Sequence, residues 1–289
     1  MASIRQLKSR IRSVKNTKQI TRAMEMVAAS KMRRAQDSTK ASAPYARLAS
    51  ELLTYLGGQN VTDTHPYFEK RTVKKRLLIV IASDKGLAGA YNTNVLRKYT
   101  QQLKEDDAMG IGNASLTIGR RATRFAARLK DTELIGAYDD MADKPRGHEL
   151  RTIVDTAIEA FTSGEVDAVD IVYTEFFNAV KQEVTMQRIL PAGYTYVEAS
   201  ENVQDATFEP SPEKVLDAVA YRLVEAQVFQ ALLDAKASEH SMRMVAMKNA
   251  TDNASDLADD LTLEMNKARQ GAITQELAEI SGGVEAMKE

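Results

Sequence analysis

The sequence predicts an α/β protein that combines a central Rossmann-like α/β domain with a long antiparallel coiled coil made by the two ends of the chain. Gly and Pro interrupt regular structure, yet both are absent from residues 1–43 and from residues 213–270. The two ends carry apolar residues at helical spacing, whereas the middle alternates apolar strands with helices. The expected parts are an N-terminal helix over 1–57, an α/β domain over 72–200 and a C-terminal helix over 211–281.

The N-terminal segment shows one apolar stripe at helical spacing. Its members are Ile4, Leu7, Ile11 and Val14, followed by Ile20, Met24, Val27 and Met32. The spacing predicts a helix with a single apolar seam. The irregular step across Lys18 is typical of a stutter, so we expect a slip in phase there.

The C-terminal segment has a start signal and a longer stripe. Ser211-Pro212-Glu213 is typical of an N-cap followed by Pro at the first helical position. Gly282-Gly283 is expected to end the helix. The stripe consists of Val215, Val219, Leu223, Phe229, Leu233, Val245, Leu257, Leu261, Met265, Ala268, Ile273, Leu277 and Ile280.

The middle of the chain reads as alternating strands and helices. Strands are expected over 75–82, 114–119, 169–176 and 184–190, and helices over 92–103, 120–130 and 151–161. This alternation predicts a layered α/β domain.

The two ends are expected to pair with each other. A helix over residues 213–280 would be roughly 100 Å long, against a radius of gyration of about 19 Å for a compact chain of this length. Residues 1–47 carry twelve Lys or Arg and two Asp or Glu, whereas residues 201–289 carry eight and seventeen. Opposite charges would flank an antiparallel contact, and the longer C-terminal helix would extend past its partner.

Composition excludes several functional classes. The chain has no Cys and only three scattered His, so disulfides, thiol catalysis, metal sites and redox cofactors are not expected. No apolar run is long enough to span a membrane, and the basic start is not followed by the apolar core of a signal peptide.

The two ends carry motifs that resemble the gamma subunit family of F-type ATP synthases. The N-terminal motif is ITRAMEMVAASKM at residues 20–32. The C-terminal motif comprises Ser238-Glu239 with RMVAMKNATDNA at 243–254, NKARQ at 266–270 and ITQELAEI at 273–280. The likeness covers the whole chain, and the one departure is Val284 after Gly283, where the family usually continues with Gly-Ala.

This resemblance implies a non-catalytic rotor without a cofactor. One copy would stand inside a ring of three alpha and three beta subunits, and the α/β domain would bind the epsilon subunit and the membrane c-ring. Rotation driven by proton flow would then drive ATP synthesis, or hydrolysis would drive rotation. The location implied is the cytoplasmic face of a bacterial inner membrane, as a peripheral protein.

The resemblance also implies contacts with the beta subunits. The residues that fall at such positions are Arg10, Lys18, Arg22, Met24, Lys31, Arg33, Arg269, Gln270 and Thr274. Contacts that form and break at each step should be solvated and individually weak.

Three other functions were weighed. Nucleic-acid binding by the basic segment is disfavoured because residues 1–44 contain no aromatic residue for base stacking and because the acidic C-terminal helix can screen its charge. A phosphate-binding loop at residues 83–90 is disfavoured because it matches neither Gly-rich phosphate motif. An adaptor that uses the coiled coil to join two proteins stays open on periodicity alone, and the terminal motifs favour the rotor.

Overall fold

A computed structural model describes residues 3–57, 65–130, 132–143, 147–193, 200, 203, 209 and 211–286. The long helices are α1 (Ile4–Gly57) and α6 (Pro212–Ala286), and the shorter ones are η2 (Pro66–Phe68), α2 (Tyr91–Ala108), α3 (Arg120–Ala126) and α4 (Gly147–Thr162). The strands are β1 (Lys75–Ile81), β2 (Gly112–Ile118), β3 (Glu133–Tyr138), β4 (Ala168–Phe176) and β5 (Gln182–Leu190). Contacts divide the chain into a helical unit of residues 1–27 and 244–289 and an α/β unit of residues 28–243, so both long helices contribute to both units.

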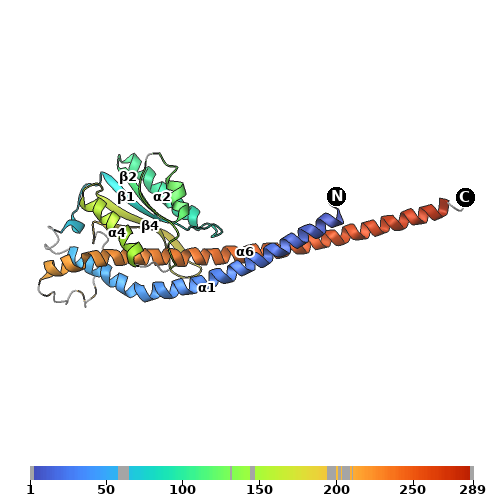
Figure 1. Ribbon diagram of the computed structural model, residues 1–289, viewed down its shortest axis with the longest axis horizontal. Coiled ribbons are helices and arrows are strands. Elements are labelled where there is room, and N and C mark those ends of the chain that lie inside the picture. The colour runs from blue at the N-terminus through green and yellow to red at the C-terminus, as the bar shows by residue number, and fades with distance from the viewer. Residues whose placement is uncertain are drawn as a thin grey trace. The chain divides into compact units, whose positions relative to one another are not determined.

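The sheet has the order β3-β2-β1-β4-β5. Strands β1 to β4 are parallel, and β5 runs antiparallel to β4. Helices α2 and α3 cover one face, while α4 and parts of α1 and α6 cover the other (Figure 1). The predicted fold class is therefore confirmed.

Two elements differ from the sequence-based prediction. Strand β3 was not predicted, because it is a short edge strand whose residues are exposed or half-buried and whose apolar residues are interrupted by Gly136. Helix α6 continues through Gly282-Gly283 to Ala286 rather than ending there. Gly lowers helix propensity by only about 1 kcal/mol, so it does not by itself end a helix.

The buried face of α1 repeats every seven residues without a break, and the slip in phase expected across Lys18 is wrong. Ile20 and Val27, expected in the seam, are 60% and 58% exposed. Polar and small residues continue the repeat instead, which an apolar pattern cannot reveal. The buried or half-buried seam positions are Leu7, Ile11, Val14, Lys18, Thr21, Glu25, Ala28, Met32, Ala35, Thr39, Ser42, Ala46, Ala49 and Leu53.

Hydrogen bonds show that α1 and α6 are antiparallel. In the α/β unit, Gln227 Nε2 donates to Ser50 Oγ at 3.0 Å, and Ser42 Oγ donates to Gln230 Oε1 at 2.5 Å. Residue numbers therefore rise along one helix as they fall along the other. This direction agrees with the expected pairing of the two ends.

A cluster of buried charges ties the strands together near the amino-terminal ends of β1 and β4. Arg76 on β1 contacts Asp106 on α2 at 2.9 Å and also contacts Asp170 on β4, which in turn pairs with Arg188 on β5. Arg76, Asp106 and Asp170 are buried, so removal of one partner would leave an uncompensated charge in the interior.

Asp234 is a buried acid on α6 in the α/β unit. Its side chain is buried, and its carboxylate oxygen Oδ1 accepts a hydrogen bond from Gln230 Nε2 at 3.2 Å. Burial raises the pKa of Asp234; the hydrogen bond from Gln230 lowers it and the charge of Glu175 on β4 raises it by smaller amounts, and the net pKa is about 7. Because this pKa is above that of an unfolded Asp, about 3.9, the carboxyl stabilises the fold below pH 4 and progressively less as the pH rises toward 7.

We predict that Asp234→Asn removes this pH dependence. The variant should be more stable than the parent by roughly a few kcal/mol at pH 8, since each pH unit between the two pKa values contributes about 1.4 kcal/mol. At pH 4 the two proteins should unfold at the same urea concentration. Asp259→Asn, at an exposed position of α6, is the matched control and should show no such difference. Equal stabilities at pH 8 would contradict the prediction.

Candidate partner-binding surface of the helix pair

The helical unit has a narrow core. Leu7 and Ile11 of α1 pack with Leu261 of α6, and Val14, Met265 and Ala268 pack against this cluster. Further along, small buried residues of α6 form the contact, among them Ala254 and Ala258. Small side chains allow two helices to approach closely.

Polar pairs occupy the middle of this seam. Thr251 Oγ1 donates to Thr21 Oγ1 at 2.8 Å, and both side chains are buried. Lys18 Nζ donates to Ser255 Oγ at 2.8 Å. These pairs favour one register of the two helices, because a shift would break both interhelical hydrogen bonds, although each Thr hydroxyl would keep its bond to a backbone carbonyl of its own helix.

Helix α6 leaves its apolar residues exposed beyond the core of the helical unit. From Arg269 to Ser281, every described side chain is exposed except that of Ala272, which is half-buried. Ile273, Leu277 and Ile280 are 46%, 59% and 64% exposed. Three large, exposed apolar side chains at helical spacing near the end of a helix indicate a surface that binds another molecule.

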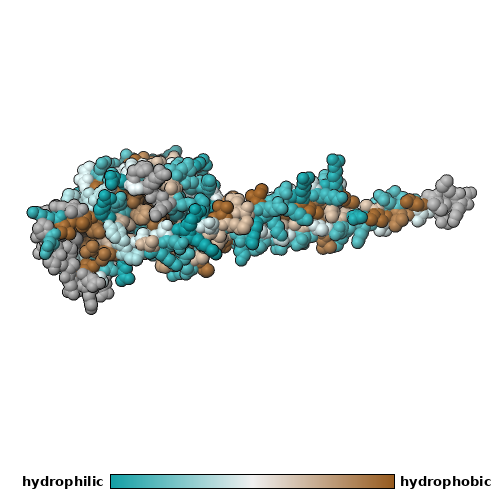
Figure 2. Space-filling view, turned by 60° about the horizontal axis from the view of Figure 1, so that its bottom comes forward, coloured by the Kyte–Doolittle hydropathy of each residue, from teal (hydrophilic) through white to brown (hydrophobic). Residues whose placement is uncertain are grey.

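Other apolar residues of the helical unit are exposed as well. We call the whole group the exposed apolar set: Ile20, Met26, Val27, Val245, Leu257, Leu263, Ile273, Leu277 and Ile280. Figure 2 shows brown apolar atoms among teal hydrophilic ones on the helices. Val245 and Leu257, expected in the buried stripe, are 44% and 49% exposed, so that expectation is wrong, and Met26 is 59% exposed. A strict seven-residue count would have found these residues.

The residues expected to contact the beta subunits are mostly accessible. Lys18, Met24 and Lys31 are half-buried. The exposed ones are Arg10, Arg22, Arg33, Arg269, Gln270 and Thr274. Lys31 and Arg33 belong to the α/β unit and the other seven to the helical unit, so the structure does not join all nine into one site.

Some of these residues have partners within the chain. Arg22 pairs with Glu25 at 3.0 Å, and Lys31 pairs with Asp143 at 2.9 Å. A hydrogen bond from His240 holds the pKa of Asp143 well below its usual range, with a smaller contribution from Lys31. Lys31 therefore has a structural contact inside the α/β unit, which the sequence pattern did not indicate.

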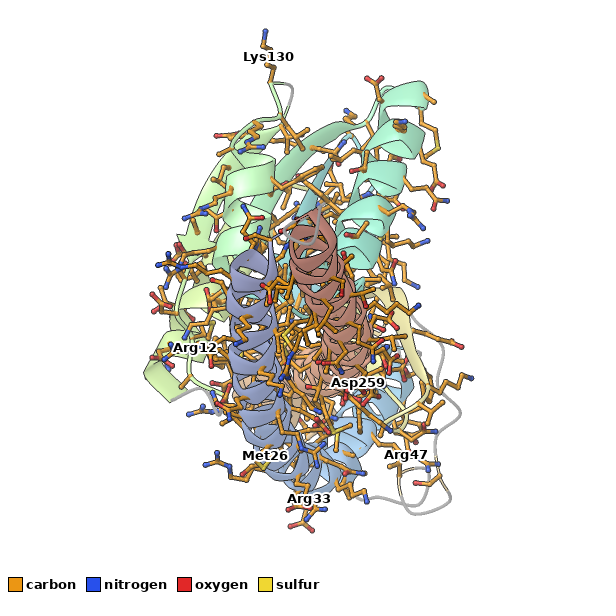
Figure 3. The ribbon with its side chains drawn as sticks, turned by 90° about the vertical axis from the view of Figure 1, so that its right-hand side faces the viewer. Arg12, Met26, Arg33, Arg47, Lys130 and Asp259 are labelled. Carbon is orange, nitrogen blue, oxygen red and sulfur yellow. The ribbon has the colours of Figure 1, made fainter. Side chains whose placement is uncertain are left out.

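The charges of the two long helices remain mostly at the surface. Between the described parts of α1 and α6 there is no ion pair, so the opposite charges of the two ends are not expressed as bridges across the seam. Figure 3 shows Arg12 and Arg33 on α1 and Asp259 on α6. Exposed charges of this kind are available to partners, and each contributes little to stability.

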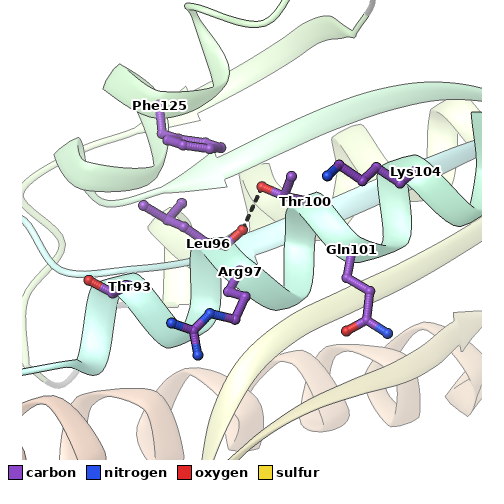
Figure 4. Close-up of a pocket in the computed structure, with 7 residues that line it drawn as sticks. All are labelled: Thr93, Leu96, Arg97, Thr100, Gln101, Lys104 and Phe125. Carbon is purple, nitrogen blue, oxygen red and sulfur yellow. Dashed lines mark hydrogen bonds between the residues drawn. The ribbon is translucent and has the colours of Figure 1, made fainter.

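The described residues offer little for catalysis. They include no group of three or more acidic, His or Cys side chains placed to hold a metal ion. No helix among them is long and apolar enough to cross a bilayer. A groove of about 590 Å³ between α2 and α3 is lined by Thr93, Leu96, Arg97, Thr100, Gln101, Lys104 and Phe125 (Figure 4). This lining contains no carboxylate or imidazole that could act as a general acid or base.

Comparison with known proteins gives one consistent result. A family model described as "ATP synthase" matches residues 3–287. The chain is 41% identical to an "ATP synthase gamma chain" of Macrococcus caseolyticus, with all of both chains covered, and 41% identical to one of Stenotrophomonas maltophilia, with 99% of this chain and all of the other covered.

Solved structures agree with the sequence comparison. A chain of the central stalk and c-ring structure of the Tetrahymena thermophila mitochondrial ATP synthase is 26% identical with a TM-score of 0.60, covering 80% of this chain and 99% of that one. A chain of the Euglena gracilis mitochondrial ATP synthase has a TM-score of 0.68 at 20% identity, covering 98% of this chain and 94% of that one, and shows a shared fold.

We predict that cysteines introduced at Leu7 and Met265 will form a disulfide. The two positions share one core cluster, and the chain has no Cys of its own to interfere. A pair at Leu7 and Val215 is the control and should not cross-link within one chain. The measurement is the mobility of the oxidised protein on a non-reducing gel. Cross-linking of the control pair in place of the first would contradict the antiparallel register.

Proposed function

Since this chain belongs to the family of ATP synthase gamma chains, we propose that it works as the central-stalk rotor of a bacterial F-type ATP synthase. The rotor makes and breaks no chemical bond itself. It couples rotation of the c-ring to the binding changes of the beta subunits, where ATP is made or hydrolysed.

The exposed apolar set of the helical unit carries this proposal. A helix pair that leaves nine large apolar side chains exposed requires a surrounding surface. A ring of three alpha and three beta subunits around one copy of this chain supplies such a surface. The apolar end with Ile273, Leu277 and Ile280 would lie in a socket of that ring.

The charged residues of the proposed contact surface favour weak contacts that exchange during rotation over one fixed contact. Arg10, Arg22 and Arg33 are exposed, so their contacts with a beta subunit would be solvated and worth about 0 to 1 kcal/mol each. Weak contacts can be exchanged at each step. Arg269, Gln270 and Thr274 lie next to the apolar end on α6 and would contact the loops of beta that surround it.

The α/β unit would bind the other partners. We propose that it contacts the epsilon subunit and the membrane c-ring, which places the chain at the cytoplasmic face of the inner membrane as a peripheral protein. The cationic groove between α2 and α3 is one accessible feature of this unit.

Co-expression with the cognate alpha and beta subunits tests the proposal. We expect a complex of three alpha, three beta and one copy of this chain, and ATP hydrolysis that depends on its presence. The stoichiometry can be measured by native mass spectrometry. A symmetric complex of another composition would favour an adaptor, and no association would contradict the rotor.

We also predict that replacing Ile273, Leu277 and Ile280 together with Ser weakens this complex. Loss of apolar area buried in the socket, at about 25 cal/mol per Å², should lower the temperature at which the complex dissociates by several degrees. The matched control replaces Asp256, Asp259 and Asp260, which are exposed on the same helix, with Ser. An equal effect of both triple variants would show that the apolar end has no socket.

A further inference from the structure

Within the α/β unit, α6 lies along the carboxyl-terminal edge of the sheet. In open α/β sheets this edge, near the point where the strand order reverses, is where ligands bind. Here the order reverses between β1 and β4. The residues that follow β1, β3 and β4 therefore surround the place where a ligand would lie.

Side chains of α6 donate hydrogen bonds to backbone carbonyls at this edge. Lys236 Nζ donates to Met141 O, after β3, at 3.3 Å. Ser238 Oγ donates to Thr174 O, near the end of β4, at 3.2 Å, and Ser241 Oγ donates to Ala179 O, after β4, at 3.0 Å. Arg243 donates to Lys85 O and Gly86 O, after β1, at 3.3 and 3.4 Å. The acceptors follow or end three different strands. We call residues 236–243 with these acceptors the α6 seat.

Charged groups reinforce the α6 seat. His240 Nε2 lies 2.8 Å from Asp143 Oδ1, and Asp143 also pairs with Lys31 of α1. Glu239 pairs with Arg243 at 2.7 Å. Glu239 and Arg243 are both largely shielded from water, so their contact is stronger than one at the surface, whereas Asp143 brings a half-exposed carboxylate to the buried His240.

The loop after β1 is built to accept hydrogen bonds at this edge rather than to hold a phosphate. The backbone N–H of Ser83 donates to Asn92 Oδ1 at 3.0 Å, and Ser83 Oγ donates to Lys85 O at 2.6 Å. Arg243 contacts the carbonyls of the same loop. A phosphate site needs backbone N–H donors directed at the ligand, whereas this loop directs carbonyl oxygens at α6.

The contacts hold α6 from more than one side. Lys236 and Ser238 are two residues apart and so project about 200° apart around the helix. One contacts the segment after β3 and the other contacts β4. Rotation of the helix about its own axis would break contacts on both sides together.

We propose that residues 236–243 of α6 occupy the place at the carboxyl-terminal edge of this sheet where other open α/β sheets bind a ligand. Their side-chain donors prevent the helix from sliding or rotating relative to the rest of the α/β unit. The consequence for torque rests on the proposed function: in a rotor, torque would pass between the α/β unit and helix α6 through the contacts of the α6 seat.

The test uses the double variant Ser238→Ala with Ser241→Ala in the full-length chain. It removes two donors without changing charge, and Ala has a higher helix propensity than Ser, so looser contacts cannot be attributed to a weaker helix. The matched control replaces Ser9 and Ser13, both exposed on α1, with Ala. Arg243→Ala is the stronger variant, and Arg243→Lys should rescue it in part.

Two measurements follow. In the free chain, amide hydrogen exchange over residues 231–243 should be at least tenfold faster in the double variant than in the parent or the control. In vesicles that contain the assembled enzyme, protons pumped per ATP hydrolysed should fall at least twofold, while hydrolysis stays within about twofold.

The outcomes separate the two proposals. Unchanged exchange in both the double variant and Arg243→Ala would overturn the α6 seat. Faster exchange with unchanged pumping per ATP would overturn its role in the rotor. Failure of the parent chain itself to assemble with alpha and beta would count against the proposed function alone, because the exchange measurement needs only the free chain.

Discussion

The structure depends on the burial of one helix on all sides. From Ala231 to Ser241, every residue of α6 is buried. Such a stretch must avoid bulky side chains where it meets its neighbours closely, and it has Ala or Ser at five of these positions. Lys236, Glu239 and His240 have partners of opposite charge, whereas Asp234 has a neutral hydrogen-bond partner, Gln230, and its pKa is raised. Ala231, Leu232 and Ala235 of this segment belong to the same core cluster as Leu77 and Ile79 of β1.

Different interactions cover the two ends of the parallel strands. Near the amino-terminal ends of β1 and β4, buried Arg and Asp side chains neutralise one another and join three strands to α2. At the carboxyl-terminal edge, backbone carbonyls are satisfied by side chains of α6. A sheet topology known for holding ligands is thereby used to hold a helix of the same chain. Fold and function differ here because the site, rather than the topology, decides what is bound.

Much of the architecture could be predicted from the sequence, because the absence of Gly and Pro marks long helices and the apolar runs mark buried strands. The start of α6 at Pro212 followed from its capping residues. The seam could not be predicted in full, since Thr21, Lys18 and Glu25 occupy positions where a pattern search expects apolar residues. For the same reason Ile20 and Val27 were assigned to the core. The contact surface was accessible only through family motifs, and those motifs did not show that Lys31 is engaged by Asp143.

The exposed apolar set also affects the life of the chain before it finds its partners. A newly made copy presents large apolar side chains along a helix pair, and nothing in its own described structure covers them. Two free copies can cover these surfaces by associating with each other, which is the first step toward aggregation. In the proposed rotor the surrounding subunits would cover these side chains, so synthesis in balance with those subunits would remove this hazard.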